Sequence, residues 1–138
     1  MNQAIDLFDA FATDTVAEEE GILTTLPDCG DIKWRIARVG NATYNQVLAK
    51  LYKRHRLVLD SKGKEAQAKS DSIMAEVYAK SILLGWEGTV QFQGKAHPYS
   101  EEVALKLLSL KDFRSKVANA SEDFATFKAK QEAEDEKN

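Results

Sequence analysis

Apolar residues recur at helical spacing in four stretches of this chain. From Tyr44 to Tyr52 they follow the i, i+3, i+4, i+7, i+8 pattern, which predicts a helix with one buried face. A longer helix is predicted over 65–84, and a shorter one begins after Ser100, whose hydroxyl is suited to cap a helix N-terminus. The last helix has an apolar stripe that comprises Phe113, Val117, Ala120, Phe124 and Phe127.

Other segments have the patterns of half-buried β-strands. Residues 22–26 are β-prone, and Trp34 lies in an alternating segment over 32–37. The turn-forming segment 27–30 between them predicts a β-hairpin. A short strand predicted at 89–92 is a candidate third strand of this hairpin. Residues 57–63 are predicted to be a loop. The chain is therefore predicted to be a mostly helical α+β protein, with an N-terminal β-hairpin packed against about four helices.

Glycines mark two changes of chain direction. Gly85 is predicted to end the long helix with a positive φ, and Gly88 to let the backbone bend again. Trp86 lies between them and is interpreted as a structural anchor, because no set of convergent polar groups surrounds it. Gly40 ends the second strand of the hairpin, and Asn41 is the predicted N-cap of the next helix.

The two ends of the chain differ from the part between them. Ile5, Phe8 and Phe11 are spaced three apart, which predicts a short amphipathic helix that must dock on its own domain or on a partner. Residues 13–20 are acidic and predicted to be loose. These patterns predict three parts: an acidic arm at 1–20, one globular α+β domain at 21–127, and a charged, disordered tail at 128–138.

The net charge of −3 hides a strong asymmetry. Residues 1–31 carry eight acidic groups and no basic one, whereas 32–69 carry ten basic groups against Asp60 and Glu65. Three arrangements fit this pattern. The arm folds back over the basic segment, the basic segment binds an acidic partner, or both are solvated surface. A nucleic-acid-binding protein that uses the basic 33–69 segment is a competing but less favoured class, because the protein is acidic and has no recognition motif.

No catalytic constellation stands out in the sequence. His55 and His97 are isolated from acidic or nucleophilic motifs, and Cys29 has no second cysteine with which to form an internal disulfide. Phosphate-binding glycine loops, zinc sets and calcium loops are not found. We therefore expect a protein that is not an enzyme and needs no cofactor or metal. No apolar run has the length that crosses a bilayer, so we expect no membrane partner and a cytoplasmic location.

Several segments in order resemble the tail assembly chaperones of long-tailed, siphovirus-like bacteriophages. They comprise 7–14, 18–21, 36–41 with Tyr44, 85–90, 98–102, and 112–113 with the following helix to Phe127. The resemblance covers most of the chain. It implies a protein of the infected host cell's cytoplasm that is absent from the finished virion. Such chaperones coat the tape measure protein and recruit tail tube subunits, and in many phages a ribosomal frameshift makes a second, longer product.

The resemblance and the residue patterns together suggest where partners bind. We expect the apolar side chains of one helix, with the basic 33–56 region beside them, to hold helical segments of the tape measure protein. The candidate contacts are Phe8, Phe11, Lys50, Arg54, Phe124 and Phe127. The alternative is that all these phenylalanines are core residues, which is at least as well supported for Phe113 and Val117. A homo-oligomer is also expected, and a small structural tail component that stays in the virion is the alternative function.

Overall fold

The computed structural model describes residues 4–128, in which the strands form two antiparallel sheets. In the first sheet, β1 (Ile22–Thr24), β2 (Trp34–Ile36) and β3 (Leu83–Trp86) lie side by side in that order. The backbone of β1 pairs Ile22 with Ile36, so the predicted hairpin is confirmed. On the other side of β2, Trp34 pairs with Trp86.

The third strand is not the predicted segment 89–92. The sequence pattern placed Leu83 in the long helix and Gly85 at its end, but α5 (Lys64–Ser81) ends earlier and Gly85 is a strand residue. Both predictions are wrong because a tertiary contact outweighs the local helical pattern. Ile82 and Leu83 are fully buried, and the Ile82 carbonyl accepts a hydrogen bond from the Ala37 N–H at 2.9 Å.

The segment 89–92 instead begins a separate hairpin. Its strands are β4 (Val90–Phe92) and β5 (Lys95–His97). Gln93 and Gly94 have φ angles of 51° and 78°, as a two-residue hairpin loop of the I′ kind requires at both positions. Gly88 has a φ of 78°, so the predicted bend after Trp86 is confirmed.

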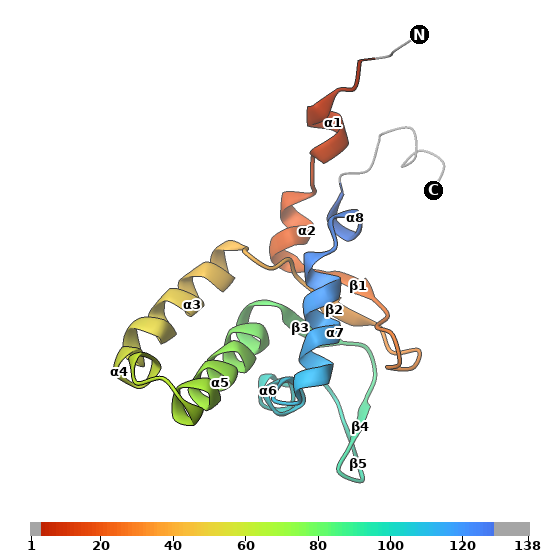
Figure 1. The fold of residues 1–138 in the computed structure, drawn as a ribbon. Coiled ribbons are helices and arrows are strands. Elements are labelled where there is room, and N and C mark those ends of the chain that lie inside the picture. The colour runs from red at the N-terminus through yellow and green to blue at the C-terminus, as the bar shows by residue number, and fades with distance from the viewer. Residues whose placement is uncertain (1–3, 129–138) are drawn as a thin grey trace.

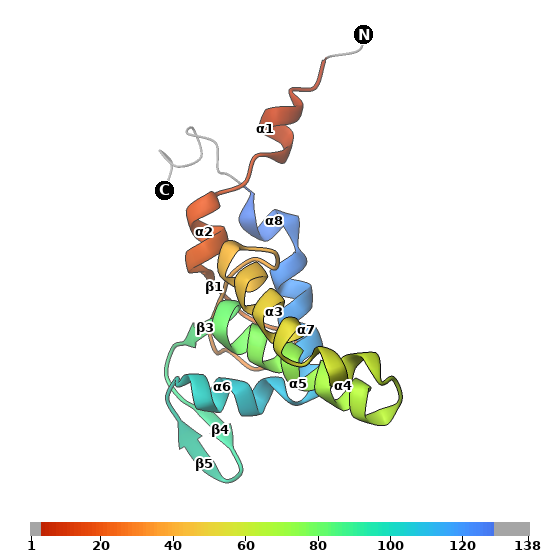
Figure 2. The same cartoon turned by 90° about the vertical axis from the view of Figure 1, so that its left-hand side faces the viewer.

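Among residues 4–128, four helices of eight or more residues pack around the sheets, as predicted, and the mostly helical α+β class is confirmed. They are α3 (Ala42–Arg54), α5, α6 (Glu101–Leu108) and α7 (Lys111–Glu122). Figures 1 and 2 show α5 between α3 and α6. Four shorter helices add to this framework: α1 (Leu7–Phe11), α2 (Thr15–Glu20), α4 (Arg56–Asp60) and α8 (Phe124–Phe127).

Three of the short helices correct the sequence-based predictions. The acidic segment predicted to be loose forms α2, because Asp14 caps it by accepting hydrogen bonds from the Val16 and Ala17 N–H groups. The predicted loop at 57–63 contains most of α4. The last helix is interrupted at Asp123, whose backbone is extended and whose carboxylate caps α8. The tail predicted to be disordered comprises residues 128–138, of which 129–138 lie outside the described residues.

The main core surrounds an aromatic cluster. The rings of Trp34 and Trp86 meet edge to face with centroids 5.5 Å apart, and Phe113 and Tyr99 extend the cluster at 5.3 and 5.0 Å. The indole N–H of Trp86 also donates to the carbonyl of His97 at 3.3 Å. Trp86 thus joins the two sheets, which matches its interpretation as an anchor. A second cluster joins α3 to α5 through the buried residues Leu51, Ile73 and Val77.

Helix caps form where the sequence predicts them. The Asn41 side-chain oxygen accepts from the Tyr44 N–H at 2.9 Å, and the Ser100 hydroxyl accepts from the Val103 N–H at 3.1 Å. Gly40 has a φ of 85°, which turns the chain from β2 into α3. Both N-cap predictions are confirmed.

Tyr78 gives the core a measurable pH dependence. Burial, with smaller contributions from Tyr44 and Glu122, raises the pKa of Tyr78 to about 12. In the unfolded chain a tyrosine ionises near a pKa of about 10. The unfolded state therefore loses this proton first, and the free energy of unfolding will fall between about pH 10 and about pH 12.

Urea titrations between about pH 8 and about pH 12 measure this loss. Because Tyr78→Phe removes the titrating group, its unfolding free energy should decline less steeply than that of the wild type. Equal slopes for the two proteins would contradict the assignment to Tyr78.

Candidate partner-binding site

The N-terminal helix α1 projects from the rest of the protein (Figures 1 and 2). Phe8 is 82% exposed and Phe11 is 67% exposed, and Ile5 and Leu7 are exposed as well. The i, i+3 and i, i+4 spacings of Leu7, Phe8 and Phe11 put these three side chains on one side of the helix. Such a concentration of exposed apolar side chains is typical of a surface that binds another molecule.

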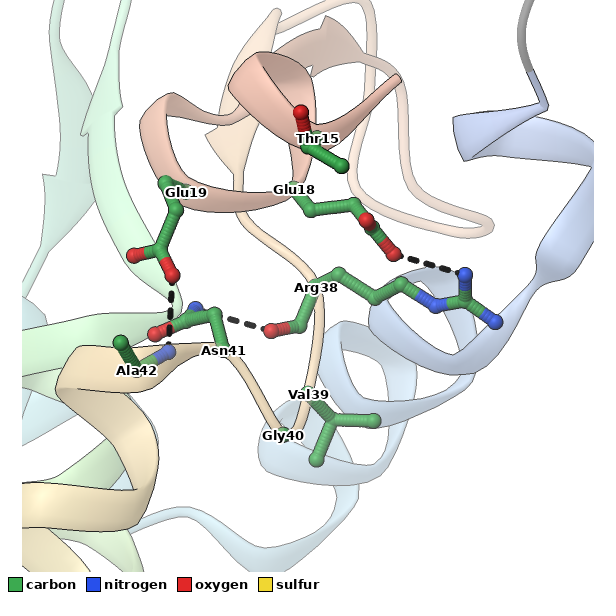
Figure 3. A pocket seen from close by; sticks show the side chains of 8 residues that line it. All are labelled: Thr15, Glu18, Glu19, Arg38, Val39, Gly40, Asn41 and Ala42. Carbon is green, nitrogen blue, oxygen red and sulfur yellow. Dashed lines mark hydrogen bonds and ion pairs between the residues drawn. The ribbon is translucent and has the colours of Figure 1, made fainter. Parts of the chain in front are cut away.

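The base of this arm is fixed to the domain by acidic side chains of α2 (Figure 3). Glu18 forms an ion pair with Arg38 at 2.8 Å, in which both side chains are about a quarter exposed. Glu19 accepts a hydrogen bond from the Ala42 N–H at 2.8 Å, where the first turn of α3 favours a negative charge. The acidic arm thus folds back over part of the basic segment, which is one of the arrangements that the charge pattern left open.

These contacts surround a hollow of about 450 Å³ between α2 and the start of α3. Its lining comprises Thr15, Glu18, Glu19, Arg38, Val39, Gly40, Asn41 and Ala42. Figure 3 shows that both glutamates are already engaged with the loop before α3 or with α3 itself. We therefore assign this hollow to the attachment of the arm and not to a ligand.

The C-terminal helix α8 supports the same attachment. The Asp14 N–H donates to the Phe127 carbonyl at 2.8 Å, and the Arg38 guanidinium lies 5.8 Å from the centroid of the Phe127 ring. Phe127 is 1% exposed, so it is a core residue here and its prediction as a partner contact is corrected. Phe124 is the first residue of α8, and its role stays a prediction.

The basic candidates lie on the other side of the molecule. Lys50 and Arg54 are exposed on α3. Where α3 meets α4, a groove of about 390 Å³ has a lining that comprises Tyr52, Lys53, Arg56, Leu59 and Asp60. We call this feature the α3–α4 groove. The sequence pattern does not predict this groove, because it predicts residues 57–63 to be a loop, although the three consecutive apolar residues at 57–59 indicate packed structure.

The structure separates two features that were predicted to lie together. Figures 1 and 2 show α1 and α4 at opposite ends of the molecule. The prediction that an exposed apolar helix has Lys50 and Arg54 beside it is therefore wrong within one copy of the chain. Arg38, which belongs to the basic segment, contacts the arm through its ion pair with Glu18 of α2.

Groups suited to chemistry are scattered. Among residues 4–128, no group of three or more His, Cys, Asp or Glu side chains could hold a metal ion. Burial is the main cause that raises the pKa of the Cys29 thiol, which disfavours the reactive thiolate. His55 lies between α3 and α4, and the Nε2 of His97 is 3.3 Å from the Phe92 carbonyl oxygen. None of the described helices is both long and apolar enough to cross a membrane.

These features define a small, mostly helical α+β protein that presents an apolar helix on an anchored arm. Within that class the sequence itself points to one family. The family model described as YdaY prophage protein matches residues 39–138, and this chain belongs to that family. The phage origin inferred from the sequence resemblance is thereby confirmed. No curated protein and no solved structure matches the chain. The matched residues begin after β2, so α1 and α2 lie outside them.

Proposed function

We propose that this protein is a non-enzymatic tail assembly chaperone, which binds the tape measure protein and recruits tail tube subunits while the phage tail is built. The observation that carries the proposal is the exposed apolar side of α1, formed by Leu7, Phe8 and Phe11. A short apolar helix face of this kind binds a partner helix through side chains at i, i+3 and i+4. Membership of a prophage family supports the setting.

The geometry of the arm suits a temporary contact. A helix of five residues covers much less surface than the roughly 1,600 Å² that stable protein complexes bury. One copy therefore binds weakly and reversibly, and a long helical client offers sites for many copies. A chaperone needs this combination, because it must leave when tube subunits replace it. In this proposal the protein acts in the host cytoplasm and is absent from the mature virion.

Replacing Phe8 and Phe11 together by alanine should weaken capture of the tape measure protein by a factor of about 100 or more, because each buried phenylalanine contributes about 1.5–3 kcal/mol. The two proteins are co-expressed, and the amount that co-purifies is measured along with the dissociation constant. Leu110→Ala is the matched control, because Leu110 is 55% exposed and lies between α6 and α7, away from the arm.

Both side chains are exposed, so the double variant should keep its fold, which circular dichroism checks. If the double variant captures the tape measure protein as well as the wild type does, α1 is not the surface that binds it. Mass spectrometry of purified virions tests the role itself. A stoichiometric amount of this protein in finished particles would show that it is a structural tail component and not a chaperone.

A further inference from the structure

Two surfaces of this molecule have complementary chemistry. The arm carries Asp6 and Asp9 around the apolar side of α1, and residues 1–14 include no basic residue. The α3–α4 groove has an aromatic and an aliphatic wall, Tyr52 and Leu59, and basic side chains at its edge. Two exposed basic side chains, Lys53 and Arg56, belong to its lining, and Asp60 in the same lining pairs with Arg56 at 3.8 Å, which leaves the lining with a net charge of +1. An acidic apolar helix thus matches a basic groove with apolar walls.

The two surfaces of one copy are held apart. α1 and α2 are separated by three residues, and the first residue before α2, Asp14, is hydrogen-bonded to the backbone of Phe127. α2 is held in turn by the Glu18–Arg38 ion pair. With its base fixed, α1 does not reach α4, which lies at the other end of the molecule in Figures 1 and 2. An arm that enters the groove therefore comes from another molecule and not from the same copy.

We propose that α1 of one copy docks in the α3–α4 groove of a second copy. Leu7 and Phe8 enter between Tyr52 and Leu59, and Asp6 and Asp9 lie near Lys53 and Arg56 of the groove lining. The groove volume of about 390 Å³ is within the range of sites that take up apolar side chains. The contact joins different surfaces of the two copies, so each copy keeps one free arm or groove, and repetition produces a chain or a ring.

The small contact area makes this association weak, reversible and dependent on concentration. The charge difference between arm and groove makes it weaker as salt rises, because ions screen exposed charges over about 10 Å at 0.1 M. This inference goes beyond the proposed function and does not depend on it. Since both use the same side of α1, a tape measure segment that binds α1 should dissociate the joined copies.

Purified full-length protein tests the inference by sedimentation velocity over a series of concentrations and salt levels. The wild type should grow in mass with concentration and shrink with salt. An arm variant, Phe8→Ala/Phe11→Ala, and a groove variant, Lys53→Glu/Arg56→Glu, should each remain monomeric. A mixture of the two should form a 1:1 complex and nothing larger, because it contains one intact groove and one intact arm for each pair.

The charge-matched control is Lys33→Glu/Lys95→Glu, which reverses two exposed charges outside the groove and should associate as the wild type does. A wild type that stays monomeric up to about 1 mM overturns the inference. So does an arm or groove variant that associates like the wild type, or a mixture of the two that forms no complex. Failure to capture the tape measure protein would end the proposed function and leave this result unaffected.

Discussion

Replacing Trp34 by alanine will lower the free energy of unfolding by about 3–5 kcal/mol, the largest single-residue effect that we expect in this protein. Trp34 is 2% exposed and lies on the central strand β2. Its ring contacts Trp86 on one side and Phe113 of α7 on another, at centroid distances of 5.5 and 5.3 Å. The truncation therefore leaves a cavity where the sheet meets the helices, and neighbours on β3 and α7 lose contacts.

Two variants make this test specific. Trp34→Phe keeps an aromatic ring, and it breaks no hydrogen bond because the Trp34 indole N–H has no partner among residues 4–128. The free energy of unfolding of Trp34→Phe should be lower than that of the wild type by less than about 2 kcal/mol. Leu57→Ala, at a side chain that is 88% exposed, should change stability by less than about 0.5 kcal/mol. Urea unfolding measures all three, and a Trp34→Ala value within about 1 kcal/mol of the wild type would contradict the central place of this ring.

The second large effect is expected at Asn41, whose replacement by alanine should cost about 2–4 kcal/mol. Its oxygen caps α3, and its side-chain nitrogen donates to the Arg38 carbonyl at 2.8 Å and to the Ser81 carbonyl at 3.0 Å. Asn41 is buried, so the alanine variant loses the cap and also the side-chain donor to the Ser81 carbonyl, whereas the Arg38 carbonyl keeps the backbone N–H of residue 41 at 3.2 Å. One side chain thus connects the end of α5 to the start of α3.

Ser100→Ala is the matched control for Asn41→Ala. Ser100 also caps a helix, with one hydrogen bond at 3.1 Å, but it is exposed. Its loss should cost about 1 kcal/mol, which is typical of an exposed N-cap. Equal losses in the two variants, measured by urea unfolding, would show that the two buried carbonyl contacts of Asn41 contribute nothing beyond the cap.

Asn41 also links stability to the candidate binding surfaces. The loop that it holds contains Arg38, and the next residue is Ala42, so the two partners of the α2 glutamates flank it. α3 then extends from Asn41 to the groove at its other end. The orientation of the arm and the position of the groove therefore depend on the same short loop.

Features set by neighbours in the chain could be predicted from the sequence. Asn41 and Ser100 cap helices because an N-cap needs only a short polar side chain and the turn that follows it. The β1–β2 hairpin forms because its strands are separated by a short turn. The apolar sides of α3 and α7 face the core as their spacing predicts, except for Tyr52, which is 40% exposed at the end of the α3 stripe. The order of the segments also indicated the phage origin.

Features that depend on distant parts of the chain were decided only by the tertiary structure. Leu83–Trp86 is a strand because β2 offers it hydrogen bonds and a buried position, which outweigh the helical spacing before it. Phe127 and Phe8 look alike in the sequence, yet α2 and Arg38 cover one while the other stays exposed. The separation of the arm from the groove follows from the same contacts. Local patterns determine which side of an element is apolar, and only the packing of distant elements determines what covers it.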